Sequence, residues 1–503
     1  MQQITFHLAV LSVAITLSVT FVSAYVVSPA GLPRHKQIAW LHEMTNTFIE
    51  TTPGDLSKSQ VQQSHLLLDA WSHLEQPNHE HALQAEILLK RVVDERMAGN
   101  LEAKLNVKDY NCLLEGWARS GSGEAAAERC ELILMEMQAH PTIRPNLSSF
   151  KTVLMAWRCA TEQESNYSHD SCLRAQQVLE WMIDLYVTGQ NRLACPDSDC
   201  FDICLQAWAR SNHPEAPAKT EQLLGAMEQL YEATLLPKLK PRTTSFNAVL
   251  YSLSKHGKTQ RAVKVLGFME LLAATGETPV PDMVSYSTVI SGFAKQLNGA
   301  RQAEKLLHRV EQEYKNGNIP LEPDTMLYNT VISAWSKSFQ PGAYRRARSV
   351  LSHQMMLQKQ TGGRFRPDVY GFTSVLGCCA LERKEQSKAF QVALATFQQL
   401  RHSEEYGSPN HVTYGTMLKC CARLLSPEDP LRAKWVRKVF RQCVADGCVG
   451  DMVLSRLREA AESDLYNDLL QGIDTKNLPL QWTMNVNDRR ECRKRNQRRT
   501  AEV

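Results

Sequence analysis

The sequence DMVSYSTVISGFAK, residues 282–295, is followed 42 residues later by DTMLYNTVISAWSK, residues 324–337. Each copy has an Asp, an aromatic residue four positions later, and a second aromatic residue seven positions after the first. Side chains seven residues apart lie on one face of a helix. The interval is longer than one helix and shorter than a domain, so it predicts the unit of a helical repeat protein.

The same aromatic anchor recurs through most of the chain at intervals of 40 to 51 residues. The anchors are Tyr110, Phe150, Phe201, Phe246, Tyr286, Tyr328, Phe372 and Tyr414, and a degenerate copy with Ser64 and Trp71 precedes them. A second amphipathic helix is predicted after most anchors, with a small residue such as Ala262 or Ala303 where the helices cross. Two helices cannot bury their own apolar stripes, so neighbouring units must stack, and we predict an all-α solenoid.

These units resemble the pentatricopeptide repeat. The opening of that repeat is similar to Leu327-Tyr328-Asn329-Thr330-Val331-Ile332, and its closing Pro-Asp is similar to Pro281-Asp282, Pro323-Asp324 and Pro367-Asp368. The resemblance covers roughly residues 57–472 and implies a right-handed superhelical solenoid of about nine antiparallel helix pairs. The units are longer than is usual for this family, and we assign the surplus to longer second helices and to insertions such as 163–170 and 276–281. The tetratricopeptide repeat, which lacks the Tyr-Asn opening and the terminal Asp, is the second candidate.

The resemblance also implies that each unit contacts one unstacked RNA base. In the family, the residue after the anchor and the last residue of the unit touch the base edge. An apolar residue two positions before the anchor wedges between bases. The implied base-binding pairs are Asn111 with Asn146, Asn247 with Asp282, Ser287 with Asp324, Asn329 with Asp368, and Thr373 with Asn410. The implied wedging residues are Val284, Met326, Tyr370 and Val412.

The pairing rule of the family assigns Asn/Asp to U, Ser/Asp to G, Thr/Asn to A, and Asn/Asn to a pyrimidine. The four C-terminal pairs then predict the core sequence U-G-U-A. Two pairs fit no rule: Lys151 with Asp197, and Asp202 with Arg242. The N-terminal wedge positions are also not apolar, being Lys108, Ser148, Asp199 and Thr244. We therefore expect the C-terminal half to read RNA and the N-terminal half to support the solenoid or to bind a protein.

The first 56 residues are typical of targeting sequences. In residues 1–24 an apolar run ends in Val22-Ser23-Ala24, which indicates a signal peptide because a membrane-spanning helix needs about 20 residues. A short N-terminal anchor is the alternative. Segment 25–56 has no acidic residue before Glu43, and Ser23-Ala24-Tyr25 resembles the junction of two-part presequences in algae with complex plastids. We expect a transit-like linker and a plastid location, with the mitochondrion or the endomembrane lumen as alternatives.

The net charge of +4 is small for a protein that binds nucleic acid. Basic residues gather in the C-terminal segment 473–503, which we expect to be disordered. They are Arg489, Arg490, Arg493, Lys494, Arg495, Arg498 and Arg499. Such a cluster contacts phosphates or is only solvated. The 14 cysteines include no Cys-x-x-Cys pair, which favours buried thiols over disulfides.

No set of residues with the spacing of a catalytic site is present. His79-Glu80-His81 has the wrong helical spacing for one metal ion, and Ser120-Gly121-Ser122-Gly123 lacks the Lys-Ser/Thr of a phosphate loop. We expect no enzyme activity, no cofactor and no metal site. The expected function is sequence-selective binding of single-stranded RNA in an organelle, in support of RNA processing, stability or translation. RNA-processing proteins are further expected partners, without stable membrane association once the presequence is removed. A helical-repeat scaffold for protein–protein interactions is the alternative.

Overall fold

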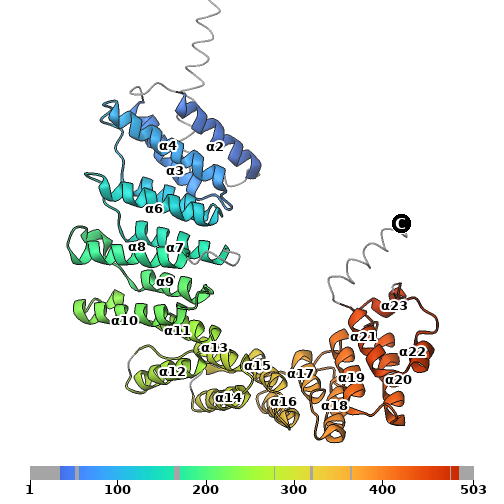
Figure 1. Ribbon diagram of the computed structural model, residues 1–503. Helices are drawn as coiled ribbons and strands as arrows, with labels where there is room; N and C mark the ends of the chain where they lie inside the picture. Colours follow the sequence, from blue (N-terminus) through green and yellow to red (C-terminus); the bar gives the residue numbers. More distant parts are fainter. Residues whose placement is uncertain are drawn as a thin grey trace, which may run out of the picture. The chain divides into compact units, whose positions relative to one another are not determined.

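The structure is a computed structural model that describes residues 34–50, 56–163, 170–276, 278–317, 321–362, 365–475 and 477–486. Within these ranges the chain is helical and contains no β-strand (Figure 1). It divides into two compact units, residues 1–252 and 253–503. The expected signal peptide 1–24 and the basic cluster 489–499 lie outside the described residues.

The first unit is a row of stacked helix pairs. Its helices are α2 (Arg34–Ile49), α3 (Lys58–Ser72), α4 (His79–Met97), α5 (Val107–Arg119), α6 (Gly123–Ala139), α7 (Leu147–Gln163), α8 (Asp170–Val187), η1 (Arg192–Ala194), α9 (Ser198–Arg210), α10 (Ala216–Thr234), η2 (Pro237–Leu239) and most of α11 (Thr243–Lys255). The first helices of successive pairs pack on one another, α3 on α5, α5 on α7 and α7 on α9. Each also packs on the second helix that follows it in sequence.

The second unit repeats this arrangement. Its helices are α12 (Thr259–Ala274), α13 (Met283–Ala294), α14 (Ala300–Lys315), α15 (Thr325–Lys337), α16 (Ala343–Gln360), α17 (Val369–Cys379), α18 (Gln386–Arg401), α19 (His411–Leu424), α20 (Pro430–Ala445), α21 (Asp451–Ala460), α22 (Ser463–Leu470) and α23 (Leu480–Thr483). The first helices α13, α15, α17 and α19 stack in order, and α21 packs on α19 as the next layer.

The aromatic anchors form the core of both stacks. Every anchor lies in the first helix of a pair, and none is more than 7% exposed. The residue seven positions later is also buried, including Trp335 at 3% and the smaller Cys379 and Cys421 at 0%. Ala262 and Ala303, predicted at helix crossings, are fully buried. The predicted all-α fold of stacked helix pairs is therefore confirmed.

Part of the extra repeat length lies in the second helices. The second helices α10 and α16 have 19 and 18 residues, whereas the first helices α13 and α17 have 12 and 11. The predicted insertion 163–170 lies almost entirely outside the described residues. The assignment to a long-repeat type stays a prediction.

The helical structure extends beyond the predicted repeat segment at both ends. Helix α2 lies within the expected linker 25–56 and packs on α3 and α4, and its Leu41 and Phe48 are buried. At the other end, the backbone N–H of Val449 donates to the carbonyl of Trp482 at 2.7 Å, and Val486 is buried. The expected linker and the expected disordered tail thus each contain folded residues, and the remaining domain boundaries stay predictions.

Most cysteine thiols are buried, and no disulfide joins the cysteines in the described part of the chain. Burial raises the pKa of Cys448 to about 11 and the pKa of Cys200 to about 12. A thiol with such a pKa forms little thiolate at neutral pH, and thiolate is the reactive form. None of the described helices is long and apolar enough to cross a membrane.

Candidate nucleic-acid interface

The last residue of each C-terminal repeat caps the first helix of the following pair. The side-chain oxygens of Asp282, Asp324, Asp368 and Asn410 accept from the backbone N–H three residues later at 2.7–3.0 Å. Asn146 makes the same bond to the N–H of Ser149 at 3.1 Å. A short side chain with an acceptor is preferred at an N-cap. Asp or Asn at this position therefore has a role in starting the helix, apart from any contact with RNA.

One predicted base-binding pair is closed on itself. The amide nitrogen of Asn329 donates to both carboxylate oxygens of Asp368, at 3.0 and 3.1 Å. Asn329 is only 7% exposed, and its Oδ1 has no hydrogen-bond donor. Gly371 leaves the room for this amide, because a Cβ at that position would lie 2.7 Å from Asn329 Oδ1.

Two further pairs are also brought together. Thr373 Oγ1 lies 2.8 Å from Thr413 Oγ1, which in turn donates to Asn410 Oδ1 at 3.1 Å. In the first unit, Asn111 Nδ2 lies 3.4 Å from Asn146 Oδ1. The two residues that the family resemblance pairs are therefore neighbours across adjacent first helices in these three cases.

The pair of Ser287 with Asp324 is not joined. The hydroxyl of Ser287 donates to the carbonyl of Val284 in its own helix at 3.2 Å, and Asp324 is exposed. Ser287 and Asp324, both within the described part of the second unit, share no hydrogen bond. Asn247 belongs to the first unit, where it is half-buried, and Asp282 belongs to the second.

The predicted wedging residues are exposed. Val284, Met326, Tyr370 and Val412 are 55%, 73%, 58% and 38% exposed. Each lies in the first turn of one of the stacked helices α13, α15, α17 and α19. Large apolar side chains exposed at one register position of successive helices form a candidate interaction surface.

A basic residue that the sequence analysis missed lies at the other end of the same helices. Lys295, Lys337 and Arg423 stand eleven positions after the wedging residue of their repeat. Eleven residues make about three helical turns, so both residues lie on the same helix face, about 16 Å apart. All three are exposed, and no carboxylate in the described part of the chain pairs with them. The signal was present in the sequence, since most repeats have Lys or Arg nine positions after the anchor.

In the first unit, the positions that correspond to the base-binding pairs and the wedging residues are occupied by ion pairs. Lys151 Nζ lies 3.1 Å from Asp197 and 2.5 Å from Asp199, and Arg242 lies 2.5 Å from Asp199 and 2.7 Å from Asp202. Hydrogen bonds from Lys151 and Arg242 lower the pKa of Asp199. The two pairs that fit no pairing rule therefore belong to one charged network that bridges neighbouring repeats.

Basic residues nine positions after the anchor are also paired in the first unit. Arg210 forms an ion pair with Glu162. Arg119 lies 4.0 Å from Glu115 and donates to the carbonyls of Ser72 and Leu74 at 2.7 and 2.9 Å. The two units thus share one helical framework but present different chemistry on the first helices.

Comparison with known proteins adds one repeat-level match. The family model described as PPR repeat, the pentatricopeptide repeat, matches residues 244–272. No curated protein sequence matches the chain at a significant level. Among solved structures, the pentatricopeptide repeat protein PPR10 from maize is similar, with 18% identity over 92% of this chain and 59% of that chain and a TM-score of 0.46.

PPR10 in complex with an 18-nt psaJ RNA element gives 17% identity over 84% of this chain and 59% of that chain, with a TM-score of 0.32. A second complex, of PPR10 with three Cys-to-Ser substitutions, gives the same values. The chain thus spans less than two thirds of the length of PPR10, and scores of this size do not establish a shared fold. The sequence match assigns one repeat of the pentatricopeptide class to α11 and α12, the pair that contains anchor Phe246 and crossing residue Ala262.

Proposed function

We propose that the chain binds single-stranded RNA in an organelle, with one base per repeat along the first helices of the second unit. The observation that carries this proposal is the combination of exposed apolar residues and unpaired cations on one face of α13, α15 and α19. An aromatic side chain such as Tyr370 on α17 stacks on any nucleobase, at about 1–3 kcal/mol per base. Aliphatic side chains such as Val284 and Met326 offer apolar surface against which a base face can pack. Lys and Arg neutralise phosphates and supply the sequence-independent part of the affinity.

Base selection is assigned to the residues between these two ends. Asn offers a donor and an acceptor, Asp offers only acceptors, and Ser offers one hydroxyl, so each pair favours a different base edge. In the structure, Asn329 and Asp368 hydrogen-bond to each other instead of to a base, and Asn329 Oδ1 has no donor. A base that separates the two side chains and donates to that oxygen would satisfy it. Within the second unit, Ser287/Asp324, Asn329/Asp368 and Thr373/Asn410 give G-U-A, the last three bases of the core U-G-U-A that the sequence predicts.

The Ser287→Asn substitution tests this assignment. Ser287 is half-buried at the register of the second base, and Asn there would favour U over G. A mismatched base should cost about 1 kcal/mol, at the low end of the range for bidentate contacts. Binding is measured with RNAs that carry each of the four bases at that position. Ser291→Asn, one turn further along α13, is the matched control and should keep the preference for G.

Identical ranking of the four RNAs by wild type and Ser287→Asn would contradict base reading by this residue. The cellular role that we propose is support of RNA processing, stability or translation, by covering a site or by recruiting RNA-processing proteins. A plastid location is part of the proposal and rests on Ser23-Ala24-Tyr25 and the acid-free stretch after it.

A protein-binding role for the first unit is the second candidate. Leu83 and Ile87 of α4 and Leu132 and Met135 of α6 are 39–50% exposed at helical spacings on two second helices. Exposed apolar side chains at such spacings favour a protein partner. This candidate would replace sequence-selective RNA binding under two conditions. Wild type and Ser287→Asn would have to rank the four RNAs identically, and both would have to bind RNA only at the non-specific level.

A further inference from the structure

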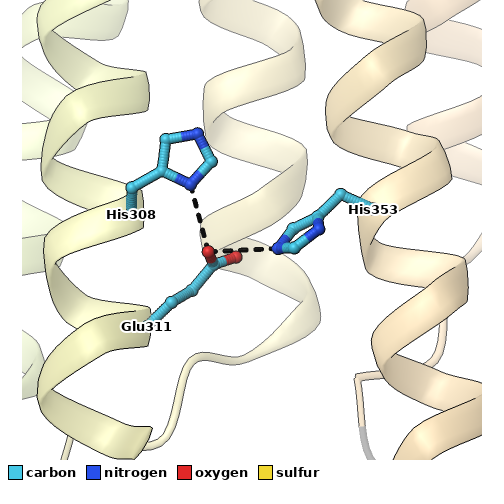
Figure 2. A group of neighbouring side chains, drawn as sticks. All are labelled: His308, Glu311 and His353. Carbon is cyan, nitrogen blue, oxygen red and sulfur yellow. Dashed lines mark hydrogen bonds and ion pairs between the residues drawn. The ribbon is translucent and has the colours of Figure 1, made fainter.

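Two histidines and a glutamate converge between the second helices of two adjacent pairs. His308 and Glu311 lie one turn apart on α14, and His353 comes from α16 (Figure 2). His308 Nδ1 and His353 Nε2 both lie 3.1 Å from the same carboxylate oxygen, Glu311 Oε2. In the described part of the chain, this is the one group of three His, Cys, Asp or Glu residues whose ligand atoms lie within 4.8 Å of one another.

The surrounding residues hold these side chains in position. The hydroxyl of Tyr328, on α15, donates to the other carboxylate oxygen, Glu311 Oε1, at 2.7 Å. His308 Nε2 faces a second carboxylate, Glu304 Oε1, at 3.7 Å. Glu304 is fixed in turn, because it accepts from Trp335 Nε1 at 2.9 Å and from Arg346 at 2.7 Å. Metal-binding imidazoles are commonly oriented by a carboxylate at their outer nitrogen.

Glu311 is buried, whereas the two imidazoles beside it are partly exposed. The side chain of Glu311 is 6% exposed, while those of His308 and His353 are 50% and 26% exposed. His308 lines a surface cleft of about 430 Å³ that also contains Arg301 and Glu304. The carboxylate therefore lies buried at the centre of the cluster, and the imidazoles are open to solvent on one side.

We propose that His308, Glu311 and His353 bind a divalent transition metal ion of the zinc type and so link α14 to α16. Two imidazoles and one carboxylate are a common three-residue zinc set, with water in the fourth position. Bonds of about 2.0–2.1 Å in tetrahedral geometry place neighbouring ligand atoms about 3.3 Å apart. The two N···O separations of 3.1 Å match this edge to about 0.2 Å. All three ligand atoms lie within 4.8 Å of one another, so side-chain movement that brings the two nitrogens to the same spacing would complete the site.

Ligand type favours zinc over the alkaline-earth ions. Mg²⁺ and Ca²⁺ prefer oxygen ligands, whereas imidazole suits Zn²⁺, Co²⁺ and Ni²⁺. Without an ion, each 3.1 Å contact requires a proton between the imidazole nitrogen and Glu311. With an ion, those nitrogens supply lone pairs, and the outer nitrogen of His308 carries a proton towards Glu304. We did not expect a metal site from the sequence, because its ligands come from two repeats and 42 residues separate Glu311 from His353.

The ion would act on the stack itself. Helices α14 and α16 belong to successive pairs, and the first helix α15 packs on both. A metal ion between the two second helices would add a direct link between repeats whose cohesion otherwise depends on nearest-neighbour packing. Zinc would therefore raise the unfolding temperature of the second unit without changing which bases are read.

The test uses the full chain, freed of metal with a chelator and titrated with Zn²⁺ by calorimetry and with Co²⁺ by visible absorption. We expect one equivalent of zinc bound to this site, and a Co²⁺ spectrum of tetrahedral type. His308→Ala and His353→Ala should each weaken that binding at least about 100-fold. Tyr328→Phe, which leaves all three ligands, should weaken it about 10-fold through loss of carboxylate orientation. His402→Ala removes an exposed histidine at the end of α18 and should leave binding unchanged.

Circular dichroism checks that each variant is folded, and His308 is half-exposed, so its replacement should be well tolerated. Thermal melts of wild type should shift upward with Zn²⁺, and melts of His308→Ala should not. The proposal is overturned if wild type binds no more zinc than His308→Ala and His353→Ala, or if zinc leaves the wild-type melting temperature unchanged. Either result would mean that the cluster is only a hydrogen-bonded contact between repeats.

Discussion

Removing the two unpaired cations Lys295 and Lys337 should weaken RNA binding in a salt-dependent way. Both lie at the C-terminal ends of first helices, on the face that carries Val284 and Met326 at the other end. The variant Lys295→Gln/Lys337→Gln replaces each lysine by a neutral polar side chain one atom shorter and so removes two positive charges. Each charge that contacts a phosphate of a single strand contributes about 0.7 to the slope of log K against log salt.

Two lost contacts should therefore reduce the slope by about 1.4. Near 0.1 M salt this corresponds to about 25-fold weaker binding, and the difference should shrink as the salt concentration rises. Base preference should not change, because phosphate contacts carry no sequence information. Fluorescence anisotropy with a short unstructured RNA containing U-G-U-A, repeated over a range of salt concentrations, measures both quantities.

The first unit supplies a control with the same change in net charge. Arg119→Gln/Arg210→Gln also removes two cations, but these are already engaged with Glu115, Glu162 and backbone carbonyls. This control should leave the slope unchanged and alter affinity by less than about twofold. Equal effects of the two double variants would show that the net charge of the chain sets the affinity, and that the position of Lys295 and Lys337 at the C-terminal ends of α13 and α15 does not.

Two further predictions concern the helix caps and the N-terminus. Asp324→Ala should destabilise the fold by about 1 kcal/mol in urea unfolding because α15 loses its N-cap. Asp324→Asn should retain the stability and alter only the base preference. If Asp324→Asn keeps both the stability and the base preference of wild type, Asp324 acts only as a helix cap. Residues 1–45 fused to a fluorescent reporter should direct it into the plastid of an alga with a complex plastid, and export to the medium would refute the assigned presequence.

The sequence was sufficient to predict the helix pairs, because the signals involved are local. An anchor aromatic and the residue seven positions later mark one face of one helix, and both are buried in every predicted repeat, even where Cys379 or Cys421 replaces the second ring. The Asp and Asn residues at the caps can be read from the sequence, but the family resemblance assigns them only to base contacts. Their role in starting helices could have been inferred from spacing, since Asp282 precedes Ser285 by three residues, as in a capping box.

Contacts between repeats were much harder to predict. The ion pairs among Lys151, Asp199 and Arg242 join residues more than 40 positions apart. The period of the repeats predicts which positions of neighbouring helices are aligned. It does not predict which charged side chains on those helices are long enough to reach one another. The cluster of His308, Glu311 and His353 has the same origin, because its two helices meet only through the stacking of α14, α15 and α16.

The small net charge of the chain is therefore a poor guide to RNA binding. A total of +4 averages over two units whose first helices differ in charge pairing. In the first unit, Lys151, Arg210 and Arg242 are each held by carboxylates and add little field at the surface. In the second unit, Lys295, Lys337 and Arg423 have no such partners in the described part of the chain, and they stand at one register position of the repeats of α13, α15 and α19, where the repeat of α17 has Leu381. A single strand along this face would meet one cation and one apolar side chain at each of α13 and α15, as the proposed binding of one base per repeat requires.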